Sequence, residues 1–230
     1  MKTIGVLGGL GPQATYDFER RLHLAAQQLI PPDGNSGYPP LVVLYFRHPP
    51  VRVKEDGQPV RPIEPNPLLA EAASRLATIS DFIVIPSNGV HLLQSYIEQA
   101  SGKKVLSIID LTLAEVERLR LKKVGVLEFV GTGIYQVPLR ARDIPFVTIP
   151  QELQIALDHA IHDYWEGKHS DEQTEVTLWA VEALRKQGTD GIILGCTELP
   201  LLLGDHAHAP DLINPAQLLA EAAVRHAIQE

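Results

Sequence analysis

Cysteine is almost absent from this chain. Cys196 is the single cysteine among 230 residues, so no disulfide can form within the chain. A chain without disulfides is typical of reducing compartments, which predicts a cytoplasmic protein. Long apolar runs are also missing, since no segment approaches the roughly 18 apolar residues of a membrane span. The N-terminus is broken by glycines and does not have the pattern of a signal peptide.

Positive charge is scarce as well. The chain has 20 basic and 28 acidic side chains, which gives a net charge of −8. This balance argues against general binding to nucleic acid or to an anionic membrane. No group of Cys, His and Asp residues has the spacing of a metal site, because His206 and His208 lie alone in a short loop. We therefore expect no bound metal.

Two segments of the chain repeat one pattern. Asp81–Asn88 and Asp190–Thr197 each begin with an acidic residue and continue through apolar residues. Each then places a small nucleophilic side chain six positions after the acid, Ser87 in the first and Cys196 in the second. The two side chains differ in chemistry, because a thiol can ionise near neutral pH and a serine hydroxyl cannot.

A second matched pair of segments, Ile4–Gly11 and Val124–Gly131, lies upstream of the first pair. This repetition predicts an α/β chain of two similar lobes. The alternation of apolar strands and helices favours parallel sheets, and we expect four strands in each lobe, flanked by helices. The predicted lobes are residues 1–104 together with 209–230, and residues 105–208.

In folds of this kind ligands bind at the carboxyl ends of the strands. The expected active site is therefore a cleft between the two lobes, with Ser87 on one wall and Cys196 on the other. Arg47 to Asn66 reads as a long irregular loop, and loops of this length are often binding loops. A capping box at Ser170–Gln173 predicts the start of a helix. Leu212-Ile213 and a last helix over 215–228 are expected to pack on the first lobe.

The placement of Cys196 suggests acid/base chemistry on a carbon acid. A thiol at a strand end and near a helix N-terminus can have its pKa lowered from about 8.5 towards neutrality. Backbone N–H groups near the strand ends would stabilise the negative charge that develops on the substrate. A basic residue of the long loop, Arg52 or Arg47, would hold a second carboxylate. The remaining candidates for binding or supporting this site are Gly9, Leu10, Asn88, Thr132, Thr197, His91 and Glu198.

Two other interpretations compete with this one. A lone cysteine is more often a buried structural thiol than a catalytic one. Gly9–Ala14 also fits the G-x-G-x-x-A pattern of dinucleotide-binding proteins, which would follow the first strand. The acidic residue expected about 20 positions later is missing, although Arg47-His48 could suit a 2′-phosphate. Dinucleotide binding would explain neither Ser87 nor Cys196.

The chain resembles the aspartate/glutamate racemase family from end to end. The segments that carry the resemblance are Ile4–Thr15, Pro86–His91 and Leu194–Glu198. It implies cofactor-independent racemisation of acidic amino acids by two opposed cysteines, a small carboxylate as partner, and a homodimer. It also implies that Arg52, in the segment Pro50–Arg52, binds the carboxylate of the substrate.

The sequence departs from the family pattern at several of these positions. Ser87 stands where the first cysteine is expected, which implies a stereochemically biased racemase. Glu166 stands where a lysine is expected, with Lys168 as a stand-in. A single cysteine also resembles the arylmalonate decarboxylase branch of the same fold. The alternatives to racemisation are therefore decarboxylation, isomerisation of an unsaturated diacid as in maleate isomerases, and binding of a small acid without catalysis.

Overall fold

The protein is described by a computed structural model that covers residues 1–55, 58–129 and 131–229. The chain forms two compact units, and each is described by itself. Unit 1 comprises Met1–Ile108 and Ala216–Glu230, and unit 2 comprises Ile109–Pro215. No helix among the described residues is both long and apolar enough to cross a membrane.

Unit 1 is built on a parallel sheet with the strand order β2-β1-β3. Every residue of β1 is buried, as expected for a central strand of a parallel sheet covered on both faces. The elements of this unit are β1 (Ile4–Gly8), α1 (Pro12–Leu29), β2 (Leu41–Tyr45), α2 (Pro67–Ala77), β3 (Phe82–Val84), the 3₁₀ helix η1 (Gly89–Leu93), α3 (Gln94–Ser101) and α9 (Pro215–Ile228).

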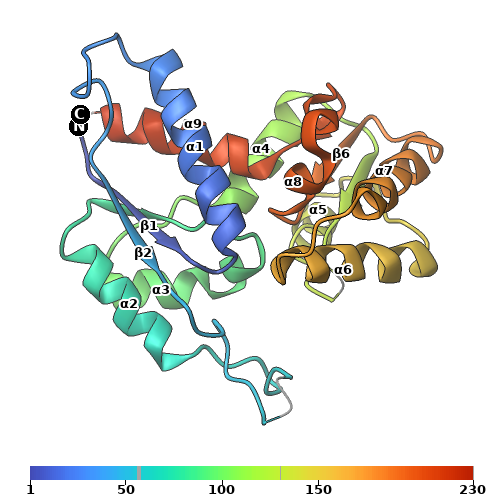
Figure 1. Ribbon diagram of the computed structural model, residues 1–230, viewed down its shortest axis with the longest axis horizontal. Helices are drawn as coiled ribbons and strands as arrows, with labels where there is room; N and C mark the ends of the chain where they lie inside the picture. Colours follow the sequence, from blue (N-terminus) through green and yellow to red (C-terminus); the bar gives the residue numbers. More distant parts are fainter. Residues whose placement is uncertain (56–57, 130, 230) are drawn as a thin grey trace. The chain divides into compact units, whose positions relative to one another are not determined.

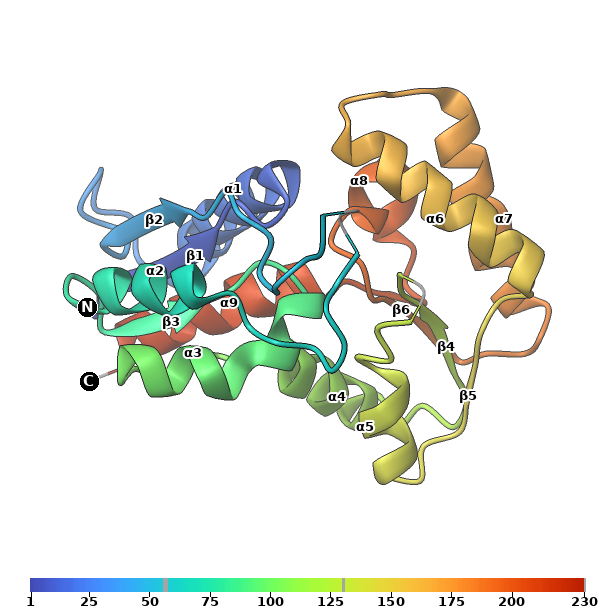
Figure 2. The same cartoon turned by 90° about the horizontal axis from the view of Figure 1, so that it is seen from below.

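Helices cover both faces of this sheet (Figures 1 and 2). Alternate strand residues such as Leu7 and Ile83 pack with α2 and α3 in one apolar cluster. On the other face, the ring of Phe82 meets that of His226 in α9 at 4.5 Å between centroids. The N–H of Lys2 donates to the carbonyl of Ala227 at 2.8 Å. The last helix therefore packs on the first unit, as the sequence predicted.

The prediction of four strands in the first lobe was wrong. The described chain of unit 1 forms a three-stranded sheet, and Val105 joins it only through an isolated parallel bridge to Ile83. The chain turns into α4 (Ile108–Arg118) three residues after Val105. This segment is therefore too short to form a ladder of several hydrogen bonds.

Unit 2 contains the expected four-stranded parallel sheet, in the order β5-β4-β6-β7. Figure 2 shows α6 and α7 on one side of β4 and β6, with α5 on the other. The elements of this unit, after α4, are β4 (Val124–Leu127), α5 (Gln136–Ala141), β5 (Phe146–Val147), α6 (Gln151–Trp165), α7 (Asp171–Arg185), β6 (Gly191–Leu194), α8 (Leu199–Leu203), the 3₁₀ helix η2 (Gly204–His208) and β7 (Leu212–Ile213).

Two local predictions in this unit had different outcomes. The capping box at the start of α7 is confirmed, because Ser170 and Gln173 exchange side-chain and backbone hydrogen bonds. The assignment of Leu212-Ile213 to the first lobe was wrong, because these residues form β7 and pair with β6. A two-residue strand carries too little pattern to reveal its partner, and its place in the chain next to α9 was misleading.

Candidate active site

Strand order places the candidate residues of unit 1 at one edge of its sheet. β1 and β3 are parallel neighbours, so Gly9 and Ser87 both follow the carboxyl ends of adjacent strands. Gly9 has a φ of +79°, and a Cβ there would lie 2.7 Å from the backbone N of Phe46. Only glycine fits this turn. Its N–H donates to the Thr15 hydroxyl at 2.9 Å, and Leu10 packs against the apolar cluster.

His91 holds the turn that carries Ser87. Its Nε2 accepts the backbone N–H of Ile108 at 3.2 Å, so the ring hydrogen is on Nδ1. Nδ1 then donates to the carbonyl oxygen of Ser87 at 2.8 Å. Asn88 is buried beside it, whereas Ser87 is partly exposed. The buried imidazole therefore connects the Ser87 turn to the first residue of α4.

Arg52 lies in the long loop, whose described residues are irregular as predicted and are held by isolated bridges. Its backbone pairs with Glu64, because the Arg52 N–H donates to the Glu64 carbonyl at 2.8 Å. The two side chains pair as well, with 2.8 Å between Arg52 Nη1 and Glu64 Oε2. Both side chains are exposed, so the guanidinium is partnered but remains accessible to solvent.

Cys196 follows β6 in unit 2, and its thiol is buried against a carboxylate. Sγ donates to Glu198 Oε2 at 2.9 Å, and the Thr197 hydroxyl donates to the same oxygen at 3.2 Å. All three residues are less than 10% exposed, with values of 8%, 2% and 6% for Cys196, Glu198 and Thr197. The structure thus brings together three of the predicted residues as a compact hydrogen-bonded group.

The expected lowering of the Cys196 pKa was wrong. Burial raises the pKa of this thiol well above its ordinary value, and the Glu198 carboxylate raises it further by its charge and its hydrogen bond. Asp158 on α6 adds to the same effect, while the Glu198 N–H opposes it. Because α8 has only five residues, its dipole is outweighed by a carboxylate in direct contact with the sulfur. The resting group is a protonated thiol.

Glu128 is a buried acid that the sequence analysis missed. It follows β4, the strand next to β6, and is 4% exposed. Its carboxylate accepts the Tyr135 N–H at 3.1 Å and the Gln136 side-chain amide at 2.7 Å. The N–H groups of Gly133 and Ile134 also donate to it, and burial nevertheless raises its pKa. An acid at a strand end, followed by a glycine-rich loop, was the signal that could have pointed to it.

Thr132 belongs to the loop that closes around Glu128. Its hydroxyl donates to the Phe129 carbonyl at 2.9 Å, and this bond stabilises the turn between the two residues. Val130, inside the repeated segment Val124–Gly131, lies outside the described residues. The structure thus gathers Thr132, Thr197, Glu198 and Cys196 around the carboxyl ends of β4 and β6. The meeting of these residues with Ser87 across a cleft stays a prediction.

Lys168, the stand-in for a substrate-binding lysine, is paired on the surface. Its Nζ lies 2.7 Å from Glu166 Oε2 and 3.0 Å from Asp163 Oδ1. These contacts raise the pKa of Lys168 to about 12. The side chains of His162, Asp163 and Glu166 are also close enough to share a metal ion in principle. They are surface groups, and the Lys168 ammonium already binds two of them.

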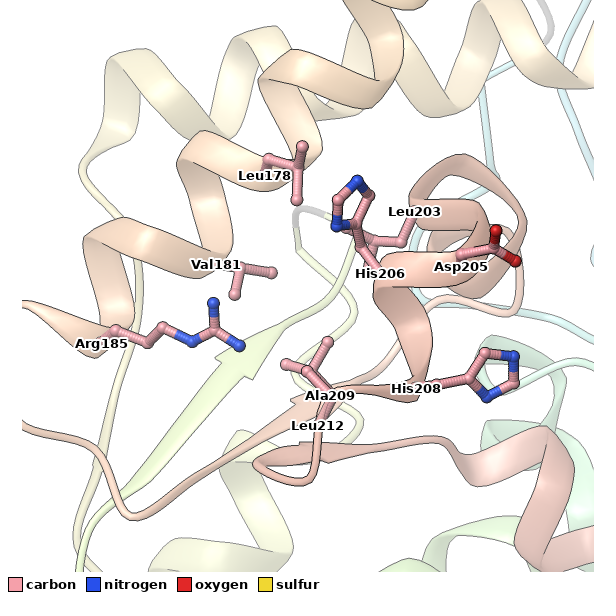
Figure 3. Close-up of a pocket in the computed structure, with 9 residues that line it drawn as sticks. All are labelled: Leu178, Val181, Arg185, Leu203, Asp205, His206, His208, Ala209 and Leu212. Atoms are coloured by element: carbon pink, nitrogen blue, oxygen red, sulfur yellow. The ribbon is translucent and has the colours of Figure 1, made fainter.

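A separate cavity of about 330 Å³ lies in unit 2 between α7 and the η2 segment (Figure 3). Arg185 borders it and is paired with Asp211 and Glu182. His206 and His208 also border it, but Figure 3 shows His208 pointing away from Arg185. The lining residues are Leu178, Val181, Arg185, Leu203, Asp205, His206, His208, Ala209 and Leu212, and none of them is a predicted active-site residue.

Comparisons with known proteins identify the relatives of this chain. The family model for Asp/Glu/hydantoin racemases matches residues 7–223. The broad specificity amino-acid racemase RacX of Bacillus subtilis is 26% identical over 225 residues, which are 96% of each chain.

Solved structures are similar in fold along the whole chain. Aspartate racemase from Picrophilus torridus superposes with a TM-score of 0.79 at 22% identity, over 99% of this chain and 94% of the other. An aspartate racemase homologue from Pyrococcus horikoshii gives a TM-score of 0.76 at 21% identity over the whole of both chains. Given the match of the family model over most of its length, this chain belongs to the Asp/Glu/hydantoin racemase family.

Proposed function

We propose that the protein is a cofactor-independent amino-acid racemase that moves the α-proton with Cys196. The observation that carries this proposal is the buried contact between the Cys196 thiol and the Glu198 carboxylate at 2.9 Å. A structural thiol needs no charged partner, and burying a carboxylate beside it is costly. A thiol and a carboxylate in contact form an acid/base pair whose proton can move between them.

The pair can run the reaction with atoms and charge in balance. The thiol proton passes from Sγ to a Glu198 oxygen, and the resulting thiolate takes the α-proton of the substrate. The electron pair of the C–H bond stays on the substrate as a carbanion delocalised into its carboxylate. The ammonium group of the substrate favours the first transfer, because a nearby positive charge stabilises the thiolate.

Return of a proton decides the product. When the thiol proton first exchanges with solvent, a proton given back by Cys196 restores the starting enantiomer, so the reaction exchanges hydrogen without inversion. A proton given to the opposite face by the Ser87 hydroxyl yields the other enantiomer; water then restores the hydroxyl, and Glu198 loses its proton to the hydroxide so formed. A serine hydroxyl is a poor base near neutral pH, so abstraction from the Ser87 side is slow. We therefore propose a stereochemically biased enzyme.

Aspartate, glutamate or a related small carboxylic acid is the substrate implied by the family. In this proposal Asn88 and Thr197 hold the α-carboxylate, with N–H groups of the Gly9-Leu10 turn nearby. Arg52 would bind a second carboxylate only by exchanging its partner Glu64. The broad specificity in the name of the Bacillus relative supports a wider range of amino acids.

Decarboxylation is a second candidate, because one protonated thiol is enough for it. Loss of carbon dioxide from a substituted malonate leaves the electrons of the broken C–C bond on an enolate. The Cys196 thiol then gives its proton to that carbon and regains one from solvent through Glu198. The raised pKa of the thiol favours this direction of proton flow.

Proton NMR in D2O with each enantiomer of an amino-acid panel tests the main proposal. We expect the α-hydrogen signal to decay with the wild type and to persist with Cys196→Ala. Release of carbon dioxide from malonates, with no α-exchange of any amino acid, would replace racemisation by decarboxylation. Exchange that persists in Cys196→Ala would refute the role of the thiol.

A further inference from the structure

The surroundings of Cys196 within unit 2 carry information about the side chain of the substrate. β4 and β6 are paired in register, with Leu127 opposite Leu194, and the Gly195 N–H donates to the Leu127 carbonyl. Phe129 and Cys196 each lie two residues beyond this pair, so they lie at equivalent levels on neighbouring strand ends. Cys196 belongs to an apolar cluster of unit 2, and Phe129 packs against the same cluster. Phe129 is therefore the aromatic residue at the strand end next to that of Cys196.

Phe129 also lies beside an aromatic residue of α6. The ring of Phe129 lies 5.3 Å from that of Trp165 between centroids. Phe129 is partly exposed, and Trp165 is 40% exposed. The two rings form a partly exposed aromatic pair between the loop after β4 and the end of α6.

Three consecutive backbone N–H groups beyond the end of β4 already bind a carboxylate. Gly133, Ile134 and Tyr135 donate their N–H groups to the Glu128 carboxylate. Successive N–H groups of this kind form an anion-binding concavity. Glu128 occupies it with a carboxylate from the chain itself, so a substrate carboxylate would have to displace a buried acid that is covalently attached.

An acidic residue of α6, Asp158, also lies near the Cys196 thiol. Gln154 donates from its side-chain amide to Asp158 Oδ1 at 2.8 Å and to the Glu128 carbonyl at 3.0 Å. These bonds fix Asp158 near the end of β4, and its charge acts on the Cys196 thiol. With Glu198 in contact with the sulfur, this part of the site suits an ammonium group and disfavours an additional carboxylate.

Two of the three cations that the sequence offered for a second carboxylate, Arg52 and Lys168, are engaged in ion pairs. Arg52 pairs with Glu64 at 2.8 Å. Lys168 pairs with Glu166 at 2.7 Å and with Asp163 at 3.0 Å. Binding a dicarboxylate through either cation would first break an existing ion pair.

We infer that the substrates are amino acids with uncharged, apolar side chains, and that Glu128 is a specificity-determining residue that excludes aspartate and glutamate. The side chain of the substrate lies against Phe129, and its ammonium group faces Asp158 and Glu198. This inference rests on the proposed racemase function, and it replaces the acidic substrates that the family implies by apolar amino acids.

The first test is the wild-type kcat/KM for α-hydrogen exchange with leucine, methionine, phenylalanine, aspartate and glutamate. Like charges placed side by side disfavour binding, so we expect the apolar amino acids to be favoured by roughly 100-fold. Exchange that is fastest with aspartate or glutamate would overturn this inference and leave the racemase function standing. Exchange of no amino acid would remove the proposed function itself.

The second test assigns the effect to Glu128. Glu128→Ala removes the acid and opens the N–H groups to a ligand, so the preference for apolar substrates should fall by about tenfold or more. Gln173→Ala is a matched control, because it removes another buried polar side chain of unit 2, 7% exposed, at the start of α7. It should slow or destabilise the enzyme without changing the ratio of substrates.

A merely structural role of Glu128 would lower all rates in parallel and leave the ratio of substrates unchanged, which would refute its assignment. If Glu128→Ala does not fold, the isosteric Glu128→Gln serves instead, because it removes the charge and keeps the shape. The wild-type panel decides the substrate class whichever variant is used.

Discussion

The Cys196 thiol is buried against Glu198, which makes two hydrogen bonds with the sulfur. The Glu198 carboxylate accepts one, through Oε2 at 2.9 Å, and the Glu198 backbone N–H donates the other. The carboxylate favours the protonated thiol, and the N–H favours the thiolate. The loop therefore fixes the sulfur in position and supplies both a proton acceptor and a group that stabilises the ionised form.

Glu198→Gln should speed up the alkylation of the Cys196 thiol and slow down catalysis. Removing the negative charge lowers the Cys196 pKa, so alkylation by iodoacetamide should be faster near neutral pH and its pH profile should shift down. Glutamine cannot take the thiol proton, so α-hydrogen exchange should fall by about 10²–10⁴-fold. The rates of alkylation and of exchange are measured from pH 6 to 10.

Thr197→Val is the matched control for this variant, because it removes the other hydrogen bond to Glu198 Oε2 and keeps the charge. Its alkylation profile should stay close to that of the wild type. An unchanged profile in Glu198→Gln would show that burial alone raises the pKa of the thiol.

The Glu128 pKa predicts a specific dependence of stability on pH. Burial raises the pKa of Glu128 in the folded state despite the N–H groups that bind its carboxylate. Its contribution to stability is therefore fully present below the unfolded pKa of about 4.3. That contribution is lost as the pH rises through the higher folded value.

Glu128→Gln does not titrate, so the difference in unfolding free energy between wild type and variant isolates this effect. We expect the wild type to lose stability relative to the variant as the pH rises above about 4.3, and the difference then to become constant. Urea unfolding at a series of pH values from 4 to 8 measures it. A difference that moves in favour of the wild type would mean that the N–H groups outweigh burial and that the folded pKa is lowered.

His91 should stabilise unit 1 through its two ring hydrogen bonds. His91→Leu keeps an apolar side chain of similar bulk but leaves the Ile108 N–H and the Ser87 carbonyl without the imidazole. Buried polar groups that lose their partner cost about 1–3 kcal/mol each. Urea unfolding measures the loss, and His23→Leu on the exposed face of α1 is the control. Equal stability of the two variants would contradict this account.

The sequence predicted those features that repeat or follow a regular period. The paired segments before Ser87 and Cys196 gave the alternation of strands and helices, and the capping box gave the start of α7. The sequence did not reveal the isolated bridge at Val105 or the pairing of Leu212-Ile213, because segments so short have no period.

The electrostatics of the candidate site were harder to predict. Glu128 reads in the sequence as a surface acid after a strand, because only the folded loop brings three N–H groups to its carboxylate. Similarly, the position of Cys196 before a helix suggested a lowered pKa. The direction of the pKa shift depends instead on the side chain of Glu198. Its orientation toward the sulfur cannot be read from its position two residues after Cys196.

Ser87→Cys is the most direct test of the bias proposed for this enzyme. In the proposed mechanism, a second thiol at this position would take or give a proton on the face opposite Cys196, whereas a serine hydroxyl is a poor base for this step. Racemisation, measured by chiral chromatography, should therefore rise by about 10²–10⁴-fold relative to α-hydrogen exchange, measured by NMR.

Ser87→Ala is the control, because it removes the hydroxyl and should lower racemisation further while exchange through Cys196 continues. Because Ser87 is partly exposed and its carbonyl, rather than its hydroxyl, binds His91, the added sulfur should leave the turn intact. A ratio of racemisation to exchange that is the same in all three proteins would show that the second proton comes from elsewhere and that Ser87 does not set the stereochemical bias.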